Sequence, residues 1–390
     1  MNFGKIFNVL DTDENIVEKL GFNPYYVEIE SGLDEKIIIN QKEYINLASN
    51  NYLGLANNSI VKKGVIEAVE KYGASLCGTP IATGYVSIFK MMEKKMANFL
   101  KLDEALIFPS GYQANLGIFN MFLDKEDIVL VDRFAHSSLV QGIMATGCKL
   151  RPFLHNNIDH LEAILKKIKG YKNIFIVTES VFSTDGTCAP LKDLTNIANK
   201  YNAFTIVDDS HGIGVLGKNG RGVLEEEEIE EFNGIYTASL GKAIGNSGGV
   251  VAGNSKLIKC LRYYCSHLVY STALTPGTLG GINSVLDIIE KDYPKIKTKM
   301  INYSKIIYSN LKKRGFNVLE SKVPINSIKT GKKENTFKLA KLFFDNGIFT
   351  TPFVEPSVPN NDGRVRLITC ANLKDSIIDE IVGKIGECKI

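Results

Sequence analysis

The stretch AFTIVDDSHGIGVLG at residues 203–217, followed by GIYTASLGKAIGNSGG at residues 234–249, decides the fold of this 390-residue chain. Each stretch opens on a short run that is hydrophobic at successive positions, a pattern typical of strands covered on both faces. The second stretch leaves one lysine, Lys242, among small and flexible residues just after its apolar run. Lysine is ordinarily a surface residue, so this placement asks for a chemical reason.

Apolar runs of the same kind recur between about residues 104 and 255, and they predict the strands of one sheet. Segments with helical periodicity begin at residues 136, 158 and 191, between several of the runs. Strand and helix in alternation are typical of an α/β fold with a mainly parallel sheet. The runs are EALIF at 104–108, DIVLVD at 127–132, NIFIVT at 173–178, FTIV at 204–207, GIYTAS at 234–239 and GGVVAG at 248–253.

The pattern changes in the last quarter of the chain. Past residue 285 the sequence shows lysine-rich amphipathic helices, a polar loop at 329–336 and two candidate strands near 347–359 and 364–369. These features predict a smaller C-terminal α+β domain. The expected division is an N-terminal segment at residues 1–55, a large α/β domain at 56–285 and the C-terminal domain at 286–390.

Composition indicates which kinds of ligand and which cellular location to expect. With 46 basic and 43 acidic residues, the net charge of +3 offers no strong field for nucleic acid or an anionic membrane, so we expect small-molecule substrates. The seven cysteines include no CxxC pair, which indicates neither a disulfide framework nor a zinc site or other metal centre. The sequence has no apolar run of membrane length and no export signal, so we expect a cytoplasmic protein without a transmembrane segment.

Polar residues follow nearly every predicted strand, and in open α/β sheets this edge binds ligands. The segments PSGYQAN, RFAHSS, ESVFSTDG, DDSHGIG and SLGK supply a turn rich in N–H groups, two histidines, carboxylates, hydroxyls and one lysine. A phosphate requires N–H groups and hydroxyls, a cationic ring nitrogen requires a carboxylate, and an aldehyde requires a lysine amine. Pyridoxal 5′-phosphate combines all three groups, so it is the expected cofactor.

The chain also resembles the α-oxoamine synthase family of pyridoxal-phosphate enzymes, which have the fold of aspartate aminotransferase. Single motifs are weak signals, but the resemblance runs through eight motifs in family order, from near the start of the chain to near its end. They are INLASNNYLGLA, FPSGYQANLGI, DRFAHSSLVQG, HNNIDHLE, VTESVFSTDGTCAPL, VDDSHGIGVLG together with SLGKAIGNSGG, YSTALTP and RVRLIT.

The resemblance implies a role for each polar residue that matches a motif. Lys242 is the lysine that joins the cofactor's aldehyde and then moves the proton on the substrate's Cα. Asp208 pairs with the ring nitrogen and keeps it protonated, while the neighbouring Asp209 is expected to be structural. His211 bonds the ring's phenolic oxygen, and His136 stacks on the ring.

Phosphate-binding residues follow from the same resemblance. Ser110, Gly111 and Tyr112 form the turn that meets the phosphate, and Ser239 adds a hydroxyl three residues before the lysine. Thr272, in YSTALTP, is the hydroxyl that the partner subunit supplies. The resemblance therefore implies a homodimer with its active site at the subunit interface.

Substrate-binding residues are also implied. Ser183 and Glu179 lie near the ring and its supporting network, and Asn50 lies near the substrate. Arg366 grips the amino-acid carboxylate, with Arg364, two residues away on the same strand face, as the alternative.

The reaction implied is the decarboxylating Claisen condensation of glycine, alanine or serine with an acyl thioester, carried by coenzyme A or by an acyl carrier protein. Serine palmitoyltransferase and 8-amino-7-oxononanoate synthase are both compatible subtypes. Two alternatives stay open, namely an aminotransferase of the same fold and a non-catalytic protein that binds the cofactor. Many family members carry arginine where this chain has Pro80, so specificity for the acyl chain is left open.

Two nucleotide-binding motifs are excluded on context. GIGVLG at residues 212–217 fits GxGxxG, but it lies mid-chain after acidic residues and leads into KNGRG, a poor helix start. A phosphate-binding loop of the GxxxxGK[ST] type would need glycine where Tyr236 stands and a hydroxyl residue at Ala243.

Overall fold

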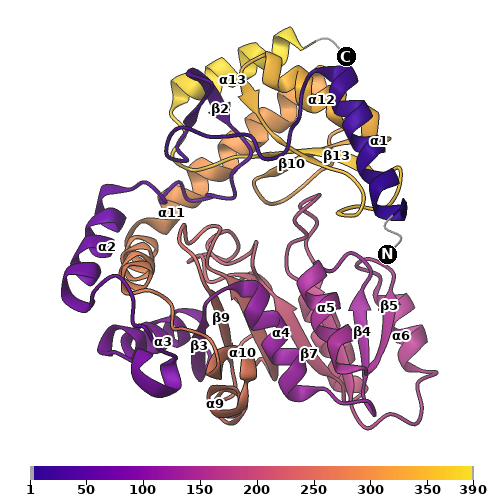
Figure 1. The fold of residues 1–390 in the computed structure, drawn as a ribbon. Coiled ribbons are helices and arrows are strands. Elements are labelled where there is room, and N and C mark those ends of the chain that lie inside the picture. The colour runs from indigo at the N-terminus through magenta and orange to yellow at the C-terminus, as the bar shows by residue number, and fades with distance from the viewer. Residues whose placement is uncertain (1–3, 389–390) are drawn as a thin grey trace. The chain divides into compact units, whose positions relative to one another are not determined.

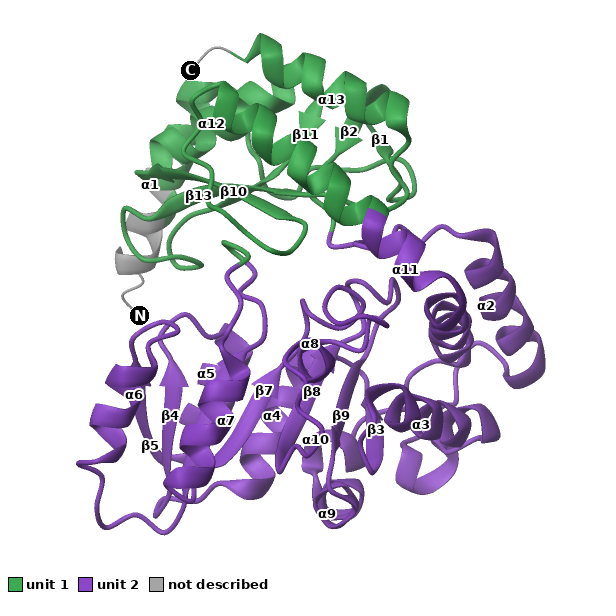
Figure 2. Cartoon of the chain, turned by 180° about the vertical axis from the view of Figure 1, so that it is seen from behind, with its two compact units in different colours: residues 1–49, 184–186, 299–390 green, residues 50–183, 187–298 purple. Residues whose placement is uncertain are grey.

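The computed structural model describes residues 4–388, which divide by their contacts into two units. Unit 1 holds residues 1–49, 184–186 and 299–390, and unit 2 holds residues 50–183 and 187–298, as the two colours of Figure 2 show. Each unit is described by itself. Within the described chain no helix is long and apolar enough to cross a membrane.

Unit 2 is built on a seven-stranded sheet within the part of the chain that the structure describes (Figure 1). Five strands pair in parallel, and β9 runs antiparallel to its neighbours β8 and β3. The mainly parallel α/β sheet predicted from the sequence is confirmed. In spatial order the strands are β3 (Glu104–Phe108), β9 (Gly249–Gly253), β8 (Gly234–Ser239), β7 (Phe204–Asp208), β6 (Ile174–Glu179), β4 (Ile128–Asp132) and β5 (Lys149–Phe153).

Helices cover both faces of this sheet, which explains the continuous apolar runs. In β4, Val129 and Val131 pack in the same core cluster as residues of α4, α5, α9 and α10. Ile128 and Leu130 point the other way, because successive strand residues alternate, and they pack with α6 and α7. The helices of unit 2 are α2 (Ser59–Tyr72), the π-helix η1 (Pro80–Gly84), α3 (Ser87–Leu100), α4 (Gly111–Phe122), α5 (Ser137–Thr146), α6 (Ile158–Leu165), α7 (Leu191–Lys200), α8 (Val223–Glu226), α9 (Ser255–Tyr264) and α10 (Ser266–Val269).

Unit 1 has two small sheets in the described residues. In the first, β13 lies between β10 and β12 and pairs antiparallel with both; in the second, β2 pairs antiparallel with β1 and parallel with β11. Its elements are α1 (Gly4–Leu20), β1 (Lys36–Ile39), β2 (Lys42–Asn46), β10 (Ile325–Gly331), α12 (Lys333–Asp345), β11 (Ile348–Phe349), β12 (Thr351–Phe353), β13 (Gly363–Ile368) and α13 (Asp375–Glu387).

Three features differ from the sequence expectations or extend them. The polar loop expected at 329–336 was wrong, because its residues end β10 and begin α12. Strand β5 was not predicted, since its residues are mostly exposed at the sheet edge and two basic residues interrupt its apolar ones. The predicted boundary at residue 285 falls inside the long helix α11 (Pro276–Lys313), and the contact division places residues 1–49 with the C-terminal part of the chain.

Helices α2 and α11 approach each other closely at two glycines. A Cβ placed on Gly280 would lie 2.2 Å from the Gly64 carbonyl oxygen and 2.7 Å from the Ala68 Cβ. Backbone cannot yield as a flexible side chain does, so this contact requires glycine.

We therefore expect Gly280→Ala to destabilise the protein by about 1–3 kcal/mol, because the two helix backbones must separate. Gly383→Ala is the matched control, since a Cβ there meets nothing within 4 Å in the middle of α13. This control should be neutral or stabilising by up to about 1 kcal/mol. Thermal and urea denaturation of both variants measure the difference, and equal stabilities would contradict the close contact.

Candidate active site

Three neighbouring strands end level at one edge of the sheet in unit 2. Glu179 of β6 lies opposite Asp208 of β7, which in turn lies opposite Thr237 of β8. Ser239 ends β8, and Lys242 follows in the loop to β9. Ligands of α/β sheets bind at the carboxyl ends of the strands, so this edge is the candidate active site.

Asp208 is a buried carboxylate held by two donors. Its Oδ2 accepts a hydrogen bond of 2.7 Å from Asn115 Nδ2, and its Oδ1 accepts one of 3.0 Å from the backbone N–H of Ser210. Only 5% of the residue is exposed. Both contacts present donors, so they keep Asp208 in the role of acceptor and in one orientation.

His136 caps helix α5 with its own ring. Its Nδ1 accepts the backbone N–H of Ser138 at 3.2 Å, as a hydroxyl would at an ordinary N-cap. An Nδ1 that accepts carries no proton, so the imidazole is neutral with its proton on Nε2. The backbone N–H of His136 donates to Glu179 Oε1 at 2.6 Å, which fixes the turn before the helix.

Charges within the site act on both of these residues. Desolvation lowers the pKa of His136; the charge of Asp208 opposes this shift and that of Lys242 adds to it. Burial raises the pKa of Glu179 well above its usual range; Asp208 adds to this effect and Lys242 opposes it. Since Lys242 influences both groups, its amine lies within electrostatic range of His136 and Glu179.

The loop that carries Lys242 is held by backbone hydrogen bonds. Leu240 N donates to Gly248 O at 3.0 Å, and Asn246 N donates to Leu240 O at 3.1 Å. Gly245 N closes the inner turn on Lys242 O at 2.9 Å. The half-buried lysine therefore stands on a rigid turn and not on a free surface loop.

His211 is buried and bonded to an aromatic hydroxyl. Its Nδ1 lies 2.8 Å from the hydroxyl of Tyr52, which is fully buried. The two rings meet edge to face at 6.0 Å between centroids. The contact fixes the plane of the imidazole.

The predicted phosphate residues gather at the N-terminus of α4. Ser110 is the N-cap of that helix, and its Oγ accepts from Gln113 N at 3.1 Å. A Cβ on Gly111 would lie 3.0 Å from the Cα and Cβ of Ser239, so only glycine lets the end of β8 approach the helix so closely. Helix N-terminal N–H groups with hydroxyls beside them suit a phosphate.

Four other predicted site residues lie outside the strand ends and the N-terminus of α4 described above. Ser183 is partly buried in the loop after β6, and Thr272 is exposed between α10 and α11. Asn50 Oδ1 is buried without a hydrogen-bond partner, so it is an acceptor open to a ligand. Arg366 lies on β13 in unit 1.

The structure distinguishes the two arginines of β13. Arg364 is 3% exposed at its side chain and binds the carboxylates of Asp185 and Asp362, each at 2.6 Å. The Arg366 guanidinium lies over the Phe353 ring, 4.7 Å from its centroid. Arg364 therefore has carboxylate partners within unit 1, and the assignment of Arg366 to a substrate carboxylate stays a prediction.

Taken together, these groups fit pyridoxal 5′-phosphate. Asp208 is an oriented acceptor for a ring nitrogen, Lys242 supplies an amine for an aldehyde, and His136 is a neutral ring for stacking. The N-terminus of α4 provides the phosphate donors. The roles of the individual residues stay predictions.

Three supporting residues lie in motifs of the sequence but were not singled out there: Asn115, Ser138 and Tyr52. Asn115 and Ser138 are 2% and 1% exposed, respectively. The available signal was a polar residue flanked by apolar ones within a helix, as in QANLGI, which is typical of a buried amide with specific partners. Sequence alone does not tell which partners those are.

The glycines of GIGVLG serve the fold of this site. A Cβ on Gly214 would meet Ala243, next to Lys242, at 2.7 Å, and one on Gly212 would meet Asp209 Oδ1 at 1.9 Å. The segment forms turns, and the next helix after it, α8, begins at Val223. A dinucleotide motif would require a helix there, so these glycines serve close packing.

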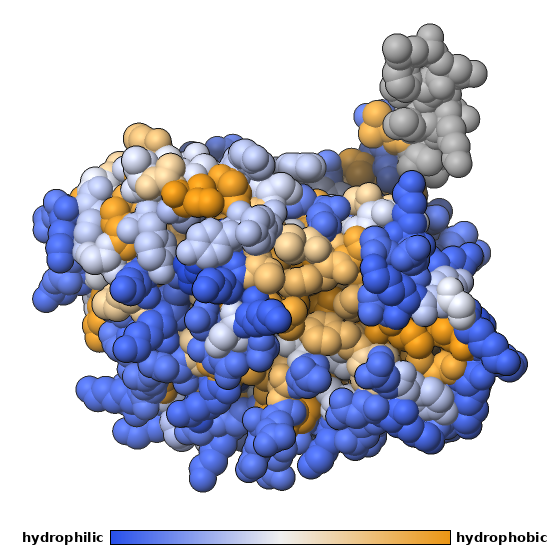
Figure 3. All heavy atoms as spheres, turned by 90° about the horizontal axis from the view of Figure 1, so that it is seen from below, coloured by the Kyte–Doolittle hydropathy of each residue, from blue (hydrophilic) through white to orange (hydrophobic). Residues whose placement is uncertain are grey.

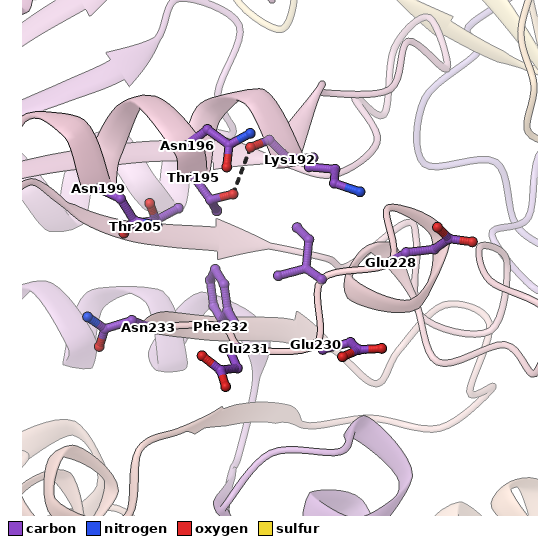
Figure 4. Close-up of a pocket in the computed structure, with 11 residues that line it drawn as sticks. Lys192, Thr195, Asn196, Asn199, Thr205, Glu228, Glu230, Glu231, Phe232 and Asn233 are labelled. Atoms are coloured by element: carbon purple, nitrogen blue, oxygen red, sulfur yellow. Dashed lines mark hydrogen bonds between the residues drawn. The ribbon is translucent and has the colours of Figure 1, made fainter.

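The pocket of Figure 4 lies at the opposite edge of the sheet. It is formed by α7, by residues 228–233 and by Thr205, near the amino ends of β7 and β8. Its side chains are mostly amides and carboxylates, with the Phe232 ring between them (Figure 4). It therefore has no part in the site formed at the carboxyl ends.

Comparison with known proteins shows which family and which solved structures this chain is similar to. The sequence profile of aminotransferase class I and II matches residues 42–385. An 8-amino-7-oxononanoate synthase of Thermoanaerobacter pseudethanolicus is 34% identical over 93% of this chain and 92% of that protein. A serine palmitoyltransferase of Sphingomonas wittichii has the same fold, with a TM-score of 0.95 at 23% identity over 100% of this chain and 98% of the other. The 8-amino-7-oxononanoate synthase of Francisella tularensis superposes with a TM-score of 0.74 at 28% identity, over 88% and 97% of the two chains.

Asp209 is a second buried carboxyl beside the site. It is fully buried, and its Oδ2 accepts from the Tyr236 hydroxyl at 2.8 Å and from Val223 N at 3.0 Å. Burial raises its pKa to about 7. The folded protein therefore binds a proton at Asp209 that the unfolded chain has released above about pH 4.

Stability should consequently fall as pH rises toward 7, relative to an Asp209→Asn variant that does not titrate. The expected difference grows by up to about 1.4 kcal/mol per pH unit between pH 5 and 7 and is level above the folded pKa. Urea unfolding of both proteins from pH 5 to 8.5 measures it. Exposed Asp379→Asn is the control and should stay parallel to the wild type, as would Asp209→Asn if Asp209 were ionised throughout.

Proposed function

The chain belongs to the aminotransferase class I and II family and to its α-oxoamine synthase group, and from this premise we propose that it condenses a small α-amino acid with an acyl thioester. The products are an α-amino ketone, the free thiol of the carrier and carbon dioxide. The observation that carries the proposal is the meeting of Lys242, Asp208 and neutral His136 at one sheet edge, beside the N-terminus of α4.

The residues present define the division of labour around the cofactor. When bound, pyridoxal 5′-phosphate supplies an aldehyde and a cationic ring that accepts the electron pair released at the substrate's Cα. Lys242 would hold the aldehyde through its amine, and the same amine would take the proton from the substrate's Cα. Asp208 accepts a hydrogen bond from the ring nitrogen and so keeps that nitrogen protonated. His136 is neutral and can stack on the ring without repelling its positive charge.

We assign binding of the amino-acid substrate to side chains other than Lys242, Asp208 and His136. Arg366 offers a planar pair of donors to the substrate carboxylate. Asn50 Oδ1, the buried acceptor without a partner, suits a donor of the substrate. His211 bonds the phenolic oxygen of the cofactor through Nε2, and Ser183 lies beside the ring.

The name of the curated relative points to a particular pair of substrates. It describes a nine-carbon acid with the amino group on C8 and the ketone on C7. A decarboxylating condensation makes this product from alanine and a seven-carbon dicarboxylic acyl thioester. We therefore propose alanine and such a thioester as the first substrates to test, with serine and a long-chain acyl thioester second, since the fold also matches serine palmitoyltransferase.

A homodimer is proposed from the exposed position of Thr272, which the family likeness assigns to the partner's phosphate site. Nearby aromatic residues are also exposed, Tyr264 at 73% and Tyr270 at 85%. Figure 3 shows hydrophobic side chains gathered within a hydrophilic surround on one face of the molecule. A cytoplasmic location remains a prediction.

The activity test combines protein, cofactor, one of glycine, alanine or serine, and acyl thioesters of several lengths on coenzyme A or a carrier protein. We expect thiol and carbon dioxide in equal amounts, and borohydride reduction of the holoprotein should label Lys242. Lys242→Ala should lose about 10²–10⁴-fold in rate, while the exposed Lys256→Ala keeps full activity.

Other outcomes identify the alternatives. Thiol release without carbon dioxide contradicts the decarboxylating step. Conversion of the cofactor to its amine form without any need for thioester indicates an aminotransferase. Cofactor binding without exchange of the substrate's Cα proton indicates a non-catalytic protein, and a label on another lysine overturns the site.

The two arginines of β13 should respond differently to conservative change. Arg366→Lys removes the paired donors and should raise the KM for the amino acid about 10–100-fold with little loss of stability. Arg364→Lys should leave that KM nearly unchanged and lower the melting temperature, because it disturbs the ion pairs of a buried guanidinium with buried Asp185 and partly exposed Asp362. Steady-state kinetics and thermal denaturation separate the two effects, and a reversed pattern would move the substrate contact to Arg364.

A further inference from the structure

Asn115 connects two groups of the candidate site through its single amide. One proton of its Nδ2 is donated to Asp208 Oδ2 at 2.7 Å, and the other to Ser138 Oγ at 2.9 Å. Ser138 Oγ in turn lies 2.8 Å from His136 Nδ1. The structure therefore contains a continuous chain from Asp208 through Asn115 and Ser138 to His136.

The chemistry of the end groups fixes the direction of every bond in this chain. The Asp208 carboxylate only accepts, so the nitrogen and not the oxygen of the Asn115 amide faces it. The Ser138 hydroxyl accepts from the same amide and has its own proton left for His136. His136 Nδ1 accepts the Ser138 backbone N–H at 3.2 Å and has one lone pair, so the Ser138 hydroxyl at 2.8 Å can donate only by sharing that lone pair. Both bonds leave the ring proton on Nε2.

Burial makes the part of this hydrogen-bonded series from Asp208 to Ser138 difficult to replace by water. Asn115, Ser138 and Asp208 are 2%, 1% and 5% exposed, respectively. In such surroundings each bond is strengthened, and the loss of one leaves a polar group unsatisfied.

The other end of the amide shows that Asn115 is not a space-filling residue. Asn115 Oδ1 is buried without a hydrogen-bond partner. An unsatisfied buried carbonyl destabilises the fold, and an apolar side chain of the same size would avoid that loss. The protein keeps this unsatisfied carbonyl oxygen at the position where the two N–H donors of the same amide are needed.

Helix α4 places the amide relative to the cofactor's phosphate. Asn115 follows Gly111 by four residues, so the two lie on one face of the helix. One rigid element thus carries the proposed phosphate donors at its first turn and the amide at the next.

We propose that Asn115 is a positioning residue that, through Ser138, holds Asp208 at the edge of the cofactor ring and His136 on its face in one geometry with fixed protons. The inference rests on the proposed function for the identity of the ring. Asn115 reaches the reaction only through Asp208 and His136.

The test uses Asn115→Leu, which keeps the size of the side chain without donors, and Ser138→Ala, which cuts only the branch to His136. Matched controls are the exposed Asn120→Leu on the same helix and the exposed Ser137→Ala beside Ser138. The readouts are histidine ¹⁵N NMR of the cofactor-free protein, the Kd for pyridoxal 5′-phosphate, and kcat and KM of the holoprotein.

Ser138→Ala should shift His136 from a single Nε2–H form to a tautomer mixture and lower kcat less than 10-fold. Asn115→Leu should also weaken cofactor binding at least 10-fold and lower kcat 10–1000-fold, with KM for the amino acid changed less than 3-fold. Both controls should behave as the wild type.

A loss of melting temperature alone, with the His136 spectrum, Kd and kcat unchanged, would overturn the proposal. If Asn115→Leu does not fold, Asn115→Asp replaces it. This variant places a second carboxylate against Asp208, which should weaken cofactor binding. An unchanged Kd would contradict the contact between residue 115 and Asp208. The NMR and Kd readouts require no turnover, so they stand even if the condensation activity is absent.

Discussion

Parallel pairing of β6, β7 and β8 is the constraint on which the site depends. Because the register sets Glu179, Asp208 and Thr237 level, the segments that follow the three strands must emerge side by side. The lysine loop, the Asp208 carboxylate and the glutamate that holds the backbone of His136 then meet without any long connection. A shift of register by one residue would turn Asp208 toward the opposite face of the sheet and break its bond to Asn115.

Close packing is the second requirement, and it explains residues that carry no chemistry. Gly111 lets β8 end against the first turn of α4, and Gly214 lets the turns after β7 pack on Ala243 in the lysine loop. Hydrogen bonds then set the protonation of the groups so assembled. His136 Nδ1 accepts a backbone N–H, and desolvation lowers the pKa of the ring, so both effects favour the neutral imidazole.

Much of this was predictable from the sequence, for identifiable reasons. Strands covered on both faces give unbroken apolar runs, so six strands of the larger sheet and the residues at their ends could be located. Strand β5 escaped because an edge strand with mostly exposed residues has no such run. The supporting bonds also escaped: Tyr52 reaches His211 across 159 positions and Asn115 reaches Asp208 across 93, and no local pattern encodes such pairs. Arg364 and Arg366 share one strand face, and the carboxylates that surround Arg364 come from positions that no local pattern indicates.

Pro80 bears on the acyl chain, since it replaces an arginine common in the family. Proline suits the first position of η1, where a backbone N–H has no helical partner. The Thr79 carbonyl accepts from Ala82 N and Gly84 N, and Gly84 packs on Ala273, beside Thr272. The substitution therefore keeps the turn under the proposed phosphate hydroxyl while it removes a positive charge. Residue 80 therefore offers no charge to the far carboxylate of a dicarboxylic acyl chain, whereas a chain with an apolar end needs none, so a comparison of the two thioesters tests whether another residue supplies that charge.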